Sequence, residues 1–499
     1  MTNHLYDTLF GQHADNDACF LSLEGGARQI SYAAFCAQVG QVAQTLVAQG
    51  VKPGDRVVAQ APKCAELVML YAATVRAGAV FLPLNTAYTQ DEVSYFVGDA
   101  TPRVIVCAPG DEAAMRALAG DAVVLTLGAD GSGSLMDRSA GHSSQFDTVA
   151  RGPDDLAALL YTSGTTGRSK GAMLSHENLA SNARVLVEAW QITGDDVLIH
   201  ALPIFHTHGL FVAMNTAALA SARVTFMALF DLDAIFAALP TATLMMGVPT
   251  FYTRLLADAR LTRDATANMR LFISGSAPLL AETHDAFADR TGHRILERYG
   301  MTETNMNTSN PYTGDRIAGS VGLPLAGTEV RLTDPQTGAP LPEGEIGMIE
   351  VRGANVFQGY WNMPEKTAEE LRDTGFFITG DLGQIGANGY LSIVGRQKDL
   401  IITGGYNVYP KEIEDVLNDL PQVKESAVFG IPHPDFGEQI IAALVLEPGA
   451  EADLAQVEAV VADKLARFKH PRRYEVLEAL PRNTMGKVQK NVLRATHAS

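Results

Sequence analysis

The sequence of 499 residues has few cysteines, fewer basic than acidic residues and no long uncharged apolar run, and each shortage excludes a class of protein. The cysteines Cys19, Cys36, Cys64 and Cys107 form no Cys-x-x-Cys pair and have no histidine at zinc-ligand spacing, which indicates free thiols in a reducing compartment. Lysine and arginine number 38 against 56 aspartate and glutamate residues, giving a net charge of -18. Such a charge repels phosphate backbones, so we expect no nucleic-acid partner.

Targeting and membrane signals are also lacking. The N-terminal residues MTNHLYDTLFGQHADND do not show the charged-then-apolar order of a signal peptide. The most apolar stretch, residues 64–84, contains Glu66 and Arg76, which disfavours a membrane span. We therefore expect a cytoplasmic protein that has no membrane partner.

The pattern along the chain predicts layered α/β sheets. The length corresponds to about three domain-sized units, and 47% hydrophobic with 19% charged residues is ordinary for a large globular core. Strand-like runs such as DRVVAQ, VFLPL and RLFISGS alternate with helical patterns, which begin after Ser31 and Ser175 and cover residues 65–76 and 250–257. This alternation favours an α/β fold with helices outside the sheets.

The pattern changes in the last third of the chain. Residues 320–395 alternate short strands with the turn signals DPQTG, PEGE and GANG, which predicts a β-rich subdomain within a large N-terminal domain over residues 1–395. After GRQKDLIITGG the chain restarts as about a hundred residues of α+β pattern, with a helix that Pro410 opens. We therefore predict a hinge at residues 396–399 and a small, mobile α+β domain over residues 400–499.

Residues 161–171, YTSGTTGRSKG, combine glycines, hydroxyl side chains and one lysine directly after the strand-like run LAALLY. Composition permits two interpretations: a linker, or a loop whose backbone N–H groups and hydroxyls bind a polyphosphate, since glycine lets the backbone approach a ligand closely. The preceding strand favours the phosphate loop. It differs from the common P-loop motif, because Lys170 precedes Gly171 and no Ser or Thr follows the lysine directly.

Five motifs in this order resemble those of the adenylate-forming enzymes, which comprise acyl-CoA synthetases, luciferases and the adenylation domains of peptide synthetases. They are YTSGTTGRSKG, ERYGMTE, ITGD, GRQKDLIITGG and PRNTMGK, and they extend over nearly the whole chain. The resemblance implies an enzyme that uses ATP, Mg²⁺ and coenzyme A. Such an enzyme activates a carboxylic acid as its adenylate and then transfers the acyl group to a thiol.

The resemblance also implies the nucleotide site. Tyr299 would stack on adenine, and Asp381 would accept hydrogen bonds from both ribose hydroxyls, with Arg396 touching ribose or phosphate. Glu303 and Thr166 would hold Mg²⁺, which prefers oxygen ligands, and would contribute to catalysis. The ATP-binding residues implied in this way are Thr162, Ser163, Gly164, Thr165, Thr166, Gly167, Lys170, Tyr299, Gly300, Met301, Thr302, Asp381, Arg396 and Lys487.

Lys487 is the implied catalytic residue of the C-terminal domain. It would bridge the acid carboxylate and the α-phosphate as charge builds during adenylate formation. Lys398 would be the hinge position, because the two half-reactions need different surroundings, and Gly404, Gly405 and Asn407 would face the pantetheine arm of CoA. The glycine-flanked loop around Lys487 also predicts reversible control by a lysine acetyltransferase and a deacetylase.

Arg298, directly before Tyr299, indicates which acid is activated. A buried guanidinium is costly unless it meets a carboxylate, so an arginine at the pocket wall predicts a substrate with a second carboxylate. The alternative is an internal salt bridge to Glu297. The stretches LPIFHTHGLF, SGSAPLLAETH, ERYGMTETNMNTSNP and PRNTMGKVQKNVLR resemble malonyl-CoA synthetases in particular. That resemblance implies an acid pocket formed by His206, Thr207, Ser276, Arg298 and Met306, with Arg298 and Ser276 on the distal carboxylate.

The sequence therefore predicts a malonate–CoA ligase that also accepts methylmalonate, since one methyl group changes binding by only about 1 to 3 kcal/mol. Three alternatives keep the motifs. A ligase for a short monocarboxylic acid such as acetate or propionate would leave Arg298 unpaired. A carrier-loading adenylation domain would need an acidic residue for a substrate amine, and HTHGLF offers none. The third alternative is an inactive binding protein.

Overall fold

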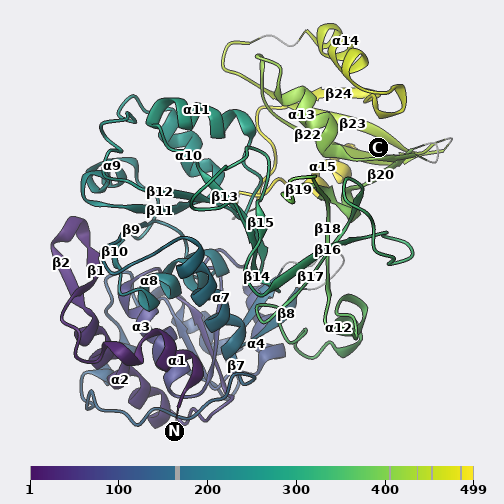
Figure 1. Cartoon of the computed structure of the whole chain (residues 1–499). Helices are drawn as coiled ribbons and strands as arrows, with labels where there is room; N and C mark the ends of the chain where they lie inside the picture. Colours follow the sequence, from purple (N-terminus) through teal and green to yellow (C-terminus); the bar gives the residue numbers. More distant parts are fainter. Residues whose placement is uncertain are drawn as a thin grey trace. The chain divides into compact units, whose positions relative to one another are not determined.

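The structure of the protein is a computed structural model that describes residues 2–162, 169–403, 406–434, 436–450, 453–483 and 486–497 (Figure 1). The chain divides into two compact units. The first is formed by Met1–Val330 and Val351–Phe377, and the second by Arg331–Glu350 and Ile378–Ser499. Within the described ranges, no helix is long and apolar enough to cross a bilayer.

One sheet of the first unit has six strands in the order β6-β5-β3-β4-β7-β8. All neighbouring pairs are parallel except β7 and β8, which are antiparallel. The strands are β3 (Arg56–Gln60), β4 (Val80–Pro83), β5 (Val104–Cys107), β6 (Val123–Thr126), β7 (Leu156–Thr162) and β8 (Lys170–Ser175). β4 and β5 are buried at every residue, as expected for parallel strands that are covered on both faces. The pairing of β7 with β8 places Thr162 opposite Lys170 at the two ends of the predicted phosphate loop.

The other sheet of the first unit has nine strands in the order β15-β14-β13-β12-β11-β9-β10-β1-β2. Its strands from β13 to β1 are parallel, and β2, β14 and β15 are antiparallel additions at the edges. The strands are β1 (Cys19–Leu23), β2 (Arg28–Ser31), β9 (Val197–His200), β10 (Arg223–Phe226), β11 (Leu244–Gly247), β12 (Leu271–Ser274), β13 (Leu296–Met301), β14 (Asn305–Ser309) and β15 (Leu323–Pro324). The loops after β9 and β12 carry the predicted acid-pocket residues His206, Thr207 and Ser276, whereas Arg298 and Met306 lie on β13 and β14.

The helices predicted after Ser31, after Ser175, over residues 65–76 and over residues 250–257 are confirmed as α2, α7, α3 and α10. The Ser31 hydroxyl accepts a hydrogen bond from the Ala34 N–H at 3.1 Å and caps α2, as expected of serine at a helix start. The helices of the first unit are α1 (His4–Leu9), α2 (Tyr32–Ala48), α3 (Ala65–Arg76), α4 (Gln90–Ala100), α5 (Glu112–Leu118), α6 (Ser134–Ser139), α7 (His176–Ala189), α8 (Asn215–Leu219), α9 (Leu232–Ala238), α10 (Pro249–Leu256), α11 (Ala281–Thr291) and α12 (Pro364–Glu370).

The second unit contains most of two sheets, together with three α-helices in its described residues. A four-stranded sheet has the order β16-β17-β18-β19, and the other has the order β21-β20-β23-β22 with β24 paired to β23. The strands are β16 (Thr328–Thr333), β17 (Ile346–Gly353), β18 (Phe377–Ile385), β19 (Leu391–Arg396), β20 (Ile401–Thr403), β21 (Tyr406–Val408), β22 (Val423–His433), β23 (Gly437–Leu446) and β24 (Arg473–Val476). The helices are α13 (Pro410–Asn418), α14 (Leu454–Lys464) and α15 (Lys490–His497). Ile413 and Leu417 of α13 lie in one apolar cluster with Val428 and Ala442 of the hairpin β22–β23.

The predicted α/β class, with a β-rich segment and a small α+β C-terminal part, is confirmed. β15 to β19 fall within residues 320–396, and Pro410 opens α13 as expected. The compact units divide the chain within the β-rich segment, since Arg331–Glu350 and Ile378 onwards belong with the C-terminal residues. The boundary at residue 395 and the hinge at residues 396–399 stay predictions.

Candidate active site

The predicted acid-pocket residues lie on strands of the nine-stranded sheet or in loops that follow them. Gly275 and Ser276 come directly after β12, and the loop with His206 and Thr207 follows β9. Arg298 lies on β13, whose neighbour β12 is in register so that Ser274 is opposite Glu297. Because the carboxyl ends of parallel strands open on one edge of a sheet, these distant segments meet there.

Arg298 is a buried cation without a counter-charge from the described residues. Its residue is 3% exposed, and its Nε and Nη2 atoms have no hydrogen-bond partner within those residues. The internal salt bridge to Glu297 is not formed; the Glu297 carboxylate instead accepts a hydrogen bond from the Leu279 N–H at 3.2 Å, since neighbouring side chains of a strand face opposite sides. Burial lowers the pKa of Arg298 to about 9, so the guanidinium keeps its charge at neutral pH.

Gly275 makes room for this guanidinium. A Cβ atom at Gly275 would lie 2.4 Å from Cζ of Arg298 and 2.6 Å from its Nε, which is closer than side-chain atoms approach one another. Glycine is therefore required here by the position of Arg298 and not by backbone conformation. Gly275 lies within SGSAPL, but its role could not be predicted, because the sequence does not show which side chain packs against a glycine.

Histidine His208, which sequence analysis did not single out, connects two of the predicted pocket residues. Its Nδ1 lies 3.2 Å from Oγ of Ser276, and its backbone N–H donates to Nδ1 of His206 at 3.4 Å. Burial and the positive charge of Arg298 hold the pKa of His208 well below its usual value, so this imidazole is neutral. Thr207 is also buried, and its hydroxyl has no partner within the described part of the chain.

Met306 and several predicted ATP-binding residues lie where β13 pairs with β14. Met306 is buried opposite Gly300, and a Cβ at Gly300 would lie 1.9 Å from the Asn305 carbonyl oxygen. The amide of Asn182 fixes Met306 by accepting from its N–H at 3.3 Å and donating to its carbonyl at 3.0 Å. Of the predicted ATP-binding residues in this segment, Tyr299 is buried, and Gly300, Met301 and Thr302 are half-buried at or directly after the end of β13.

Residues that are predicted to bind phosphate and metal lie near the end of β7 and the start of β8. The Thr162 hydroxyl donates to Oε1 of Glu303 at 3.4 Å, and Glu303 is 6% exposed, so that burial raises the pKa of its carboxyl. Lys170 begins β8 opposite Thr162. The remaining residues of the predicted loop, Ser163, Gly164, Thr165, Thr166 and Gly167, lie outside the described residues.

Two further residues, which belong to none of the five motifs, complete this cluster. Glu370 accepts hydrogen bonds from the Lys170 ammonium at 3.0 and 3.1 Å. The Tyr360 hydroxyl lies 2.6 Å from Oε2 of Glu370 and 3.2 Å from Oε1 of Glu303. Tyr360 therefore stands between the two carboxylates, and its ring lies 4.1 Å from the Lys170 ammonium.

The donor set at Glu303 fits Mg²⁺. Among the described residues, no group of three or more histidines, cysteines and carboxylates has metal-binding geometry. A single buried carboxylate suits Mg²⁺, because this cation keeps several waters and takes most of its other ligands from substrate phosphates. Glu303 would supply that carboxylate; Thr166, its predicted companion, falls in the undescribed part of the loop.

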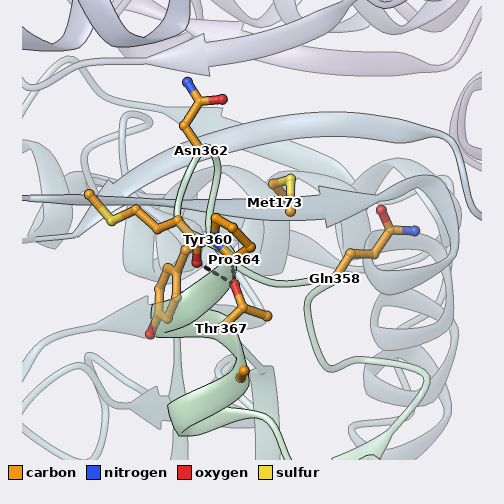
Figure 2. Close-up of a pocket in the computed structure, with 8 residues that line it drawn as sticks. Met173, Gln358, Tyr360, Asn362, Pro364 and Thr367 are labelled. Carbon is orange, nitrogen blue, oxygen red and sulfur yellow. Dashed lines mark hydrogen bonds between the residues drawn. The ribbon is translucent and has the colours of Figure 1, made fainter.

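An open pocket of about 440 Å³ lies beside this segment, and Figure 2 shows residues that line it. Of the residues discussed above, only Tyr360 contributes to it. The pocket is lined by Met173, Gln358, Tyr360, Asn362, Met363, Pro364, Thr367 and Ala368. Its lining contains no predicted site residue.

The second unit brings Asp381 and Arg396 together. They are opposite one another in the pairing of β18 with β19, and Nε of Arg396 lies 2.8 Å from Oδ1 of the buried Asp381. The guanidinium therefore orients the carboxylate that is predicted to bind ribose. Lys398 lies in a short helical turn, Gln397–Asp399, and burial lowers the pKa of its ammonium.

The remaining predicted residues of the second unit are exposed or undescribed. The side chain of Asn483 accepts from the Lys487 N–H at 2.9 Å, and the Asn483 N–H donates back to the Lys487 carbonyl at 2.9 Å. This turn presents Lys487 at the surface. Asn407 is exposed on β21, whereas Gly404 and Gly405 lie outside the described residues.

Comparisons with known proteins decide the family. The family described as AMP-binding enzyme matches residues 10–361, and the AMP-binding enzyme C-terminal domain matches residues 412–487. The chain belongs to the family of AMP-binding enzymes. The predicted membership of the adenylate-forming acyl-CoA ligases is thereby confirmed.

Relatives of this AMP-binding enzyme cover nearly all of its chain. It is 36% identical to feruloyl-CoA synthase from Amycolatopsis, over 94% of each chain, and 33% identical to malonate–CoA ligase from Arabidopsis thaliana, over 91% of this chain and 80% of that one. The crystal structure of ATP-bound MatB from Rhodopseudomonas palustris is 58% identical, with a TM-score of 0.98, and the match covers 100% of this chain and 99% of that one. Glu370 lies between the two segments that the family descriptions match.

Proposed function

We propose that this AMP-binding enzyme is a malonate–CoA ligase. In the first half-reaction a malonate carboxylate oxygen attacks the α-phosphorus of ATP, and pyrophosphate leaves to give malonyl-AMP. In the second, the thiolate of CoA attacks the acyl carbon, and AMP leaves to give malonyl-CoA. The observation that carries the proposal is the buried guanidinium of Arg298, which no described carboxylate neutralises.

An unpaired buried charge is costly, and removing one partner of a buried pair typically costs about 3 to 5 kcal/mol. A substrate with a second carboxylate would supply the missing partner, whereas acetate and propionate would leave the Arg298 guanidinium without a counter-charge. Ser276 and Thr207 offer hydroxyls, and His208 offers a neutral imidazole. The pocket thus combines the positive charge of Arg298 with hydrogen-bonding groups, which suits an extra carboxylate. The relatives are named for different acids, so the proposal of malonate rests on the unpaired charge of Arg298.

The residues of the family motifs would hold the nucleotide. Thr162 and Lys170 would bind the phosphates, Tyr299 would contact adenine, and Asp381, oriented by Arg396, would accept the ribose hydroxyls. Glu303 would hold Mg²⁺, which would neutralise the phosphate oxygens during displacement of pyrophosphate. These groups act by positioning and by electrostatic stabilisation, without a protein nucleophile.

The C-terminal residues would serve the two half-reactions in turn. Lys487 would stabilise the charge that develops between the carboxylate and the α-phosphate, and Lys398 would be the position where the backbone turns between the steps. Asn407 would then face the pantetheine arm of CoA. Because Lys487 is exposed, a lysine acetyltransferase could remove its charge and a deacetylase could restore it.

The test is CoA-dependent AMP production with acetate, propionate, malonate and methylmalonate. We expect malonate to give the highest kcat/KM, methylmalonate to follow within the roughly 10- to 200-fold that one methyl group costs, and the monocarboxylic acids to fall well below. Equal use of propionate and malonate would contradict the proposal and favour a ligase for another short acid. AMP production that needs a carrier protein in place of CoA would favour a carrier-loading adenylation domain.

A further inference from the structure

The Lys170 ammonium is held by a carboxylate of its own chain. Both oxygens of Glu370 accept from Nζ of Lys170, at 3.0 and 3.1 Å, and the two side chains are only 15% and 23% exposed. A lysine ammonium has three N–H donors. Two of them can therefore point at Glu370 while the third remains for a phosphate oxygen.

Tyr360 connects this ion pair to the predicted metal carboxylate. Its hydroxyl lies 2.6 Å from Glu370 and 3.2 Å from Glu303. A phenol has one proton to donate, and the shorter distance assigns it to Glu370. The positive charge of Lys170 also acts to lower the pKa of Glu303, while its ammonium forms its ion pair with Glu370.

The fold fixes Glu370 in this contact. Thr367 of α12 accepts from the Tyr360 N–H and donates to the Met363 carbonyl, each at 2.9 Å, and Figure 2 shows this threonine against the backbone at Tyr360. Glu370 lies three residues after Thr367 and so projects from the same side of α12. Next to Tyr360, the Trp361 N–H donates to the Gly171 carbonyl at 2.8 Å, which ties the segment to β8 directly after Lys170.

We propose that Glu370 is the positioning residue of Lys170: it keeps the ammonium beside Tyr360 and thereby leaves the Glu303 carboxylate free to bind Mg²⁺ with ATP. Without the Glu370 charge, the ammonium would turn to Glu303, the other carboxylate that Tyr360 contacts, and would compete there with the metal. The inference rests on the proposed function only in that this site binds MgATP. It does not depend on which acid is activated.

The chain offers a matched control in the preceding residue. Glu369 lies on the same helix and contacts Lys366 at 2.7 Å, and Glu370 also contacts Lys366, at 3.0 Å. The Glu369 side chain is 65% exposed and forms its ion pair with Lys366, whereas the pair to Lys170 belongs to Glu370. Glu369→Gln therefore removes one carboxylate from α12 without touching Lys170.

The experiment measures MgATP binding by calorimetry, without acid, at increasing Mg²⁺ concentrations. We expect Glu370→Gln to raise the Mg²⁺ concentration for half-maximal ATP binding about 10-fold, Glu370→Asp to give an intermediate shift, and Glu369→Gln to stay within about 2-fold of the wild type. The KM for MgATP in pyrophosphate release should rise in parallel. Thioester formation from a preformed acyl-adenylate should be unchanged, because that step no longer involves the triphosphate.

A double-mutant cycle tests whether Glu370 acts through Lys170. In a Lys170→Met background, we expect Glu370→Gln to have no further effect on the Mg²⁺ requirement. Equal behaviour of Glu370→Gln and Glu369→Gln, or an undiminished Glu370→Gln effect in the Lys170→Met background, would overturn the proposal. Equal loss in both half-reactions together with a lower Tm would also overturn it, since Glu370 would then support only the fold. Failure of the wild type to bind MgATP would contradict the proposed function instead.

Discussion

Arg298 and Lys170 are two cations of the same unit with opposite arrangements of counter-charge. Arg298 is buried at the predicted acid pocket, and its Nε and Nη2 atoms meet no acceptor among the described residues. Lys170, at the phosphate end, is already paired with Glu370 and lies against Tyr360. A ligand would have to supply the counter-charge of Arg298, whereas Glu370 of the protein already supplies that of Lys170.

This difference in counter-charge gives the two cations different parts in the proposed choice of acid. A cation without a protein partner gains most from a ligand that brings a negative charge, so Arg298 can discriminate between acids. A cation that already has a partner gains less on binding but is held in place, so Lys170 can orient a phosphate without selecting the acid. Mutations that change one arrangement and not the other test this division.

The largest effect is expected for Arg298→Ala. Truncation removes the charge that pairs with the distal carboxylate, at a cost of about 2 to 5 kcal/mol, which corresponds to roughly 30- to 5000-fold in kcat/KM for malonate. Propionate has no second carboxylate and should lose little. The measurement is the ratio of kcat/KM for the two acids in wild type and variant. Equal losses for both acids would contradict the assignment of Arg298 to the distal carboxylate.

Lys487→Ala extends the comparison to a cation that is exposed in the second unit. If this lysine stabilises charge only during adenylate formation, its loss should slow that step by about 100- to 1000-fold, the range expected for one preorganised donor. Malonyl-CoA formation from supplied malonyl-AMP should be nearly unchanged. A matching loss in both steps would show that Lys487 acts in the second step too, or supports the fold.

Gly275→Ala should disturb Arg298 without removing it. The added Cβ would lie 2.4 Å from the guanidinium carbon, and overpacking of this kind costs about 1 to 3 kcal/mol, or roughly 5- to 150-fold in kcat/KM for malonate. Gly110→Ala is the control, because a Cβ at Gly110 meets no atom within 4 Å. If the kcat/KM of Gly275→Ala for malonate equals that of the wild type, the Arg298 guanidinium does not lie against Gly275 in solution.

The smallest effect concerns the neutral histidine beside Arg298. The pKa of His208 is lowered on folding by burial and by nearby positive charge, so the unfolded chain binds the proton more readily. This histidine's contribution to stability is therefore full above about pH 6.5 and decreases as the pH falls below that value, by at most about 1.4 kcal/mol per pH unit. His208→Asn retains a polar group for Ser276 and cannot titrate.

Urea unfolding at pH 7.5 and pH 5.5 checks this expectation. The free energy of unfolding of the wild type should fall on acidification by about 1 kcal/mol more than that of His208→Asn, while the other buried histidines affect both proteins equally. Identical decreases would indicate that His208 takes up no proton on unfolding and is already protonated in the fold.

Local signals allowed much of the fold to be predicted. Ser31 and Ser175 cap α2 and α7, and Pro410 opens α13, because a cap needs only its own residue and the next turn. The motifs also predicted roles for Glu303, Asp381 and Arg396, and the last two pair directly across neighbouring strands. The roles of Gly275, His208 and Glu370 could not be predicted, because each depends on a residue from a distant segment.

The sequence by itself determined which strands and helices form, which family the motifs belong to and that an arginine precedes Tyr299. It left open whether Arg298 pairs with Glu297, and it gave no sign that Glu370 holds Lys170. The tertiary structure decided both, since burial and counter-charge depend on where separate segments meet. Patterns of a few residues set the local backbone, but the free energy of a buried charge is set by every group around it, from anywhere in the chain.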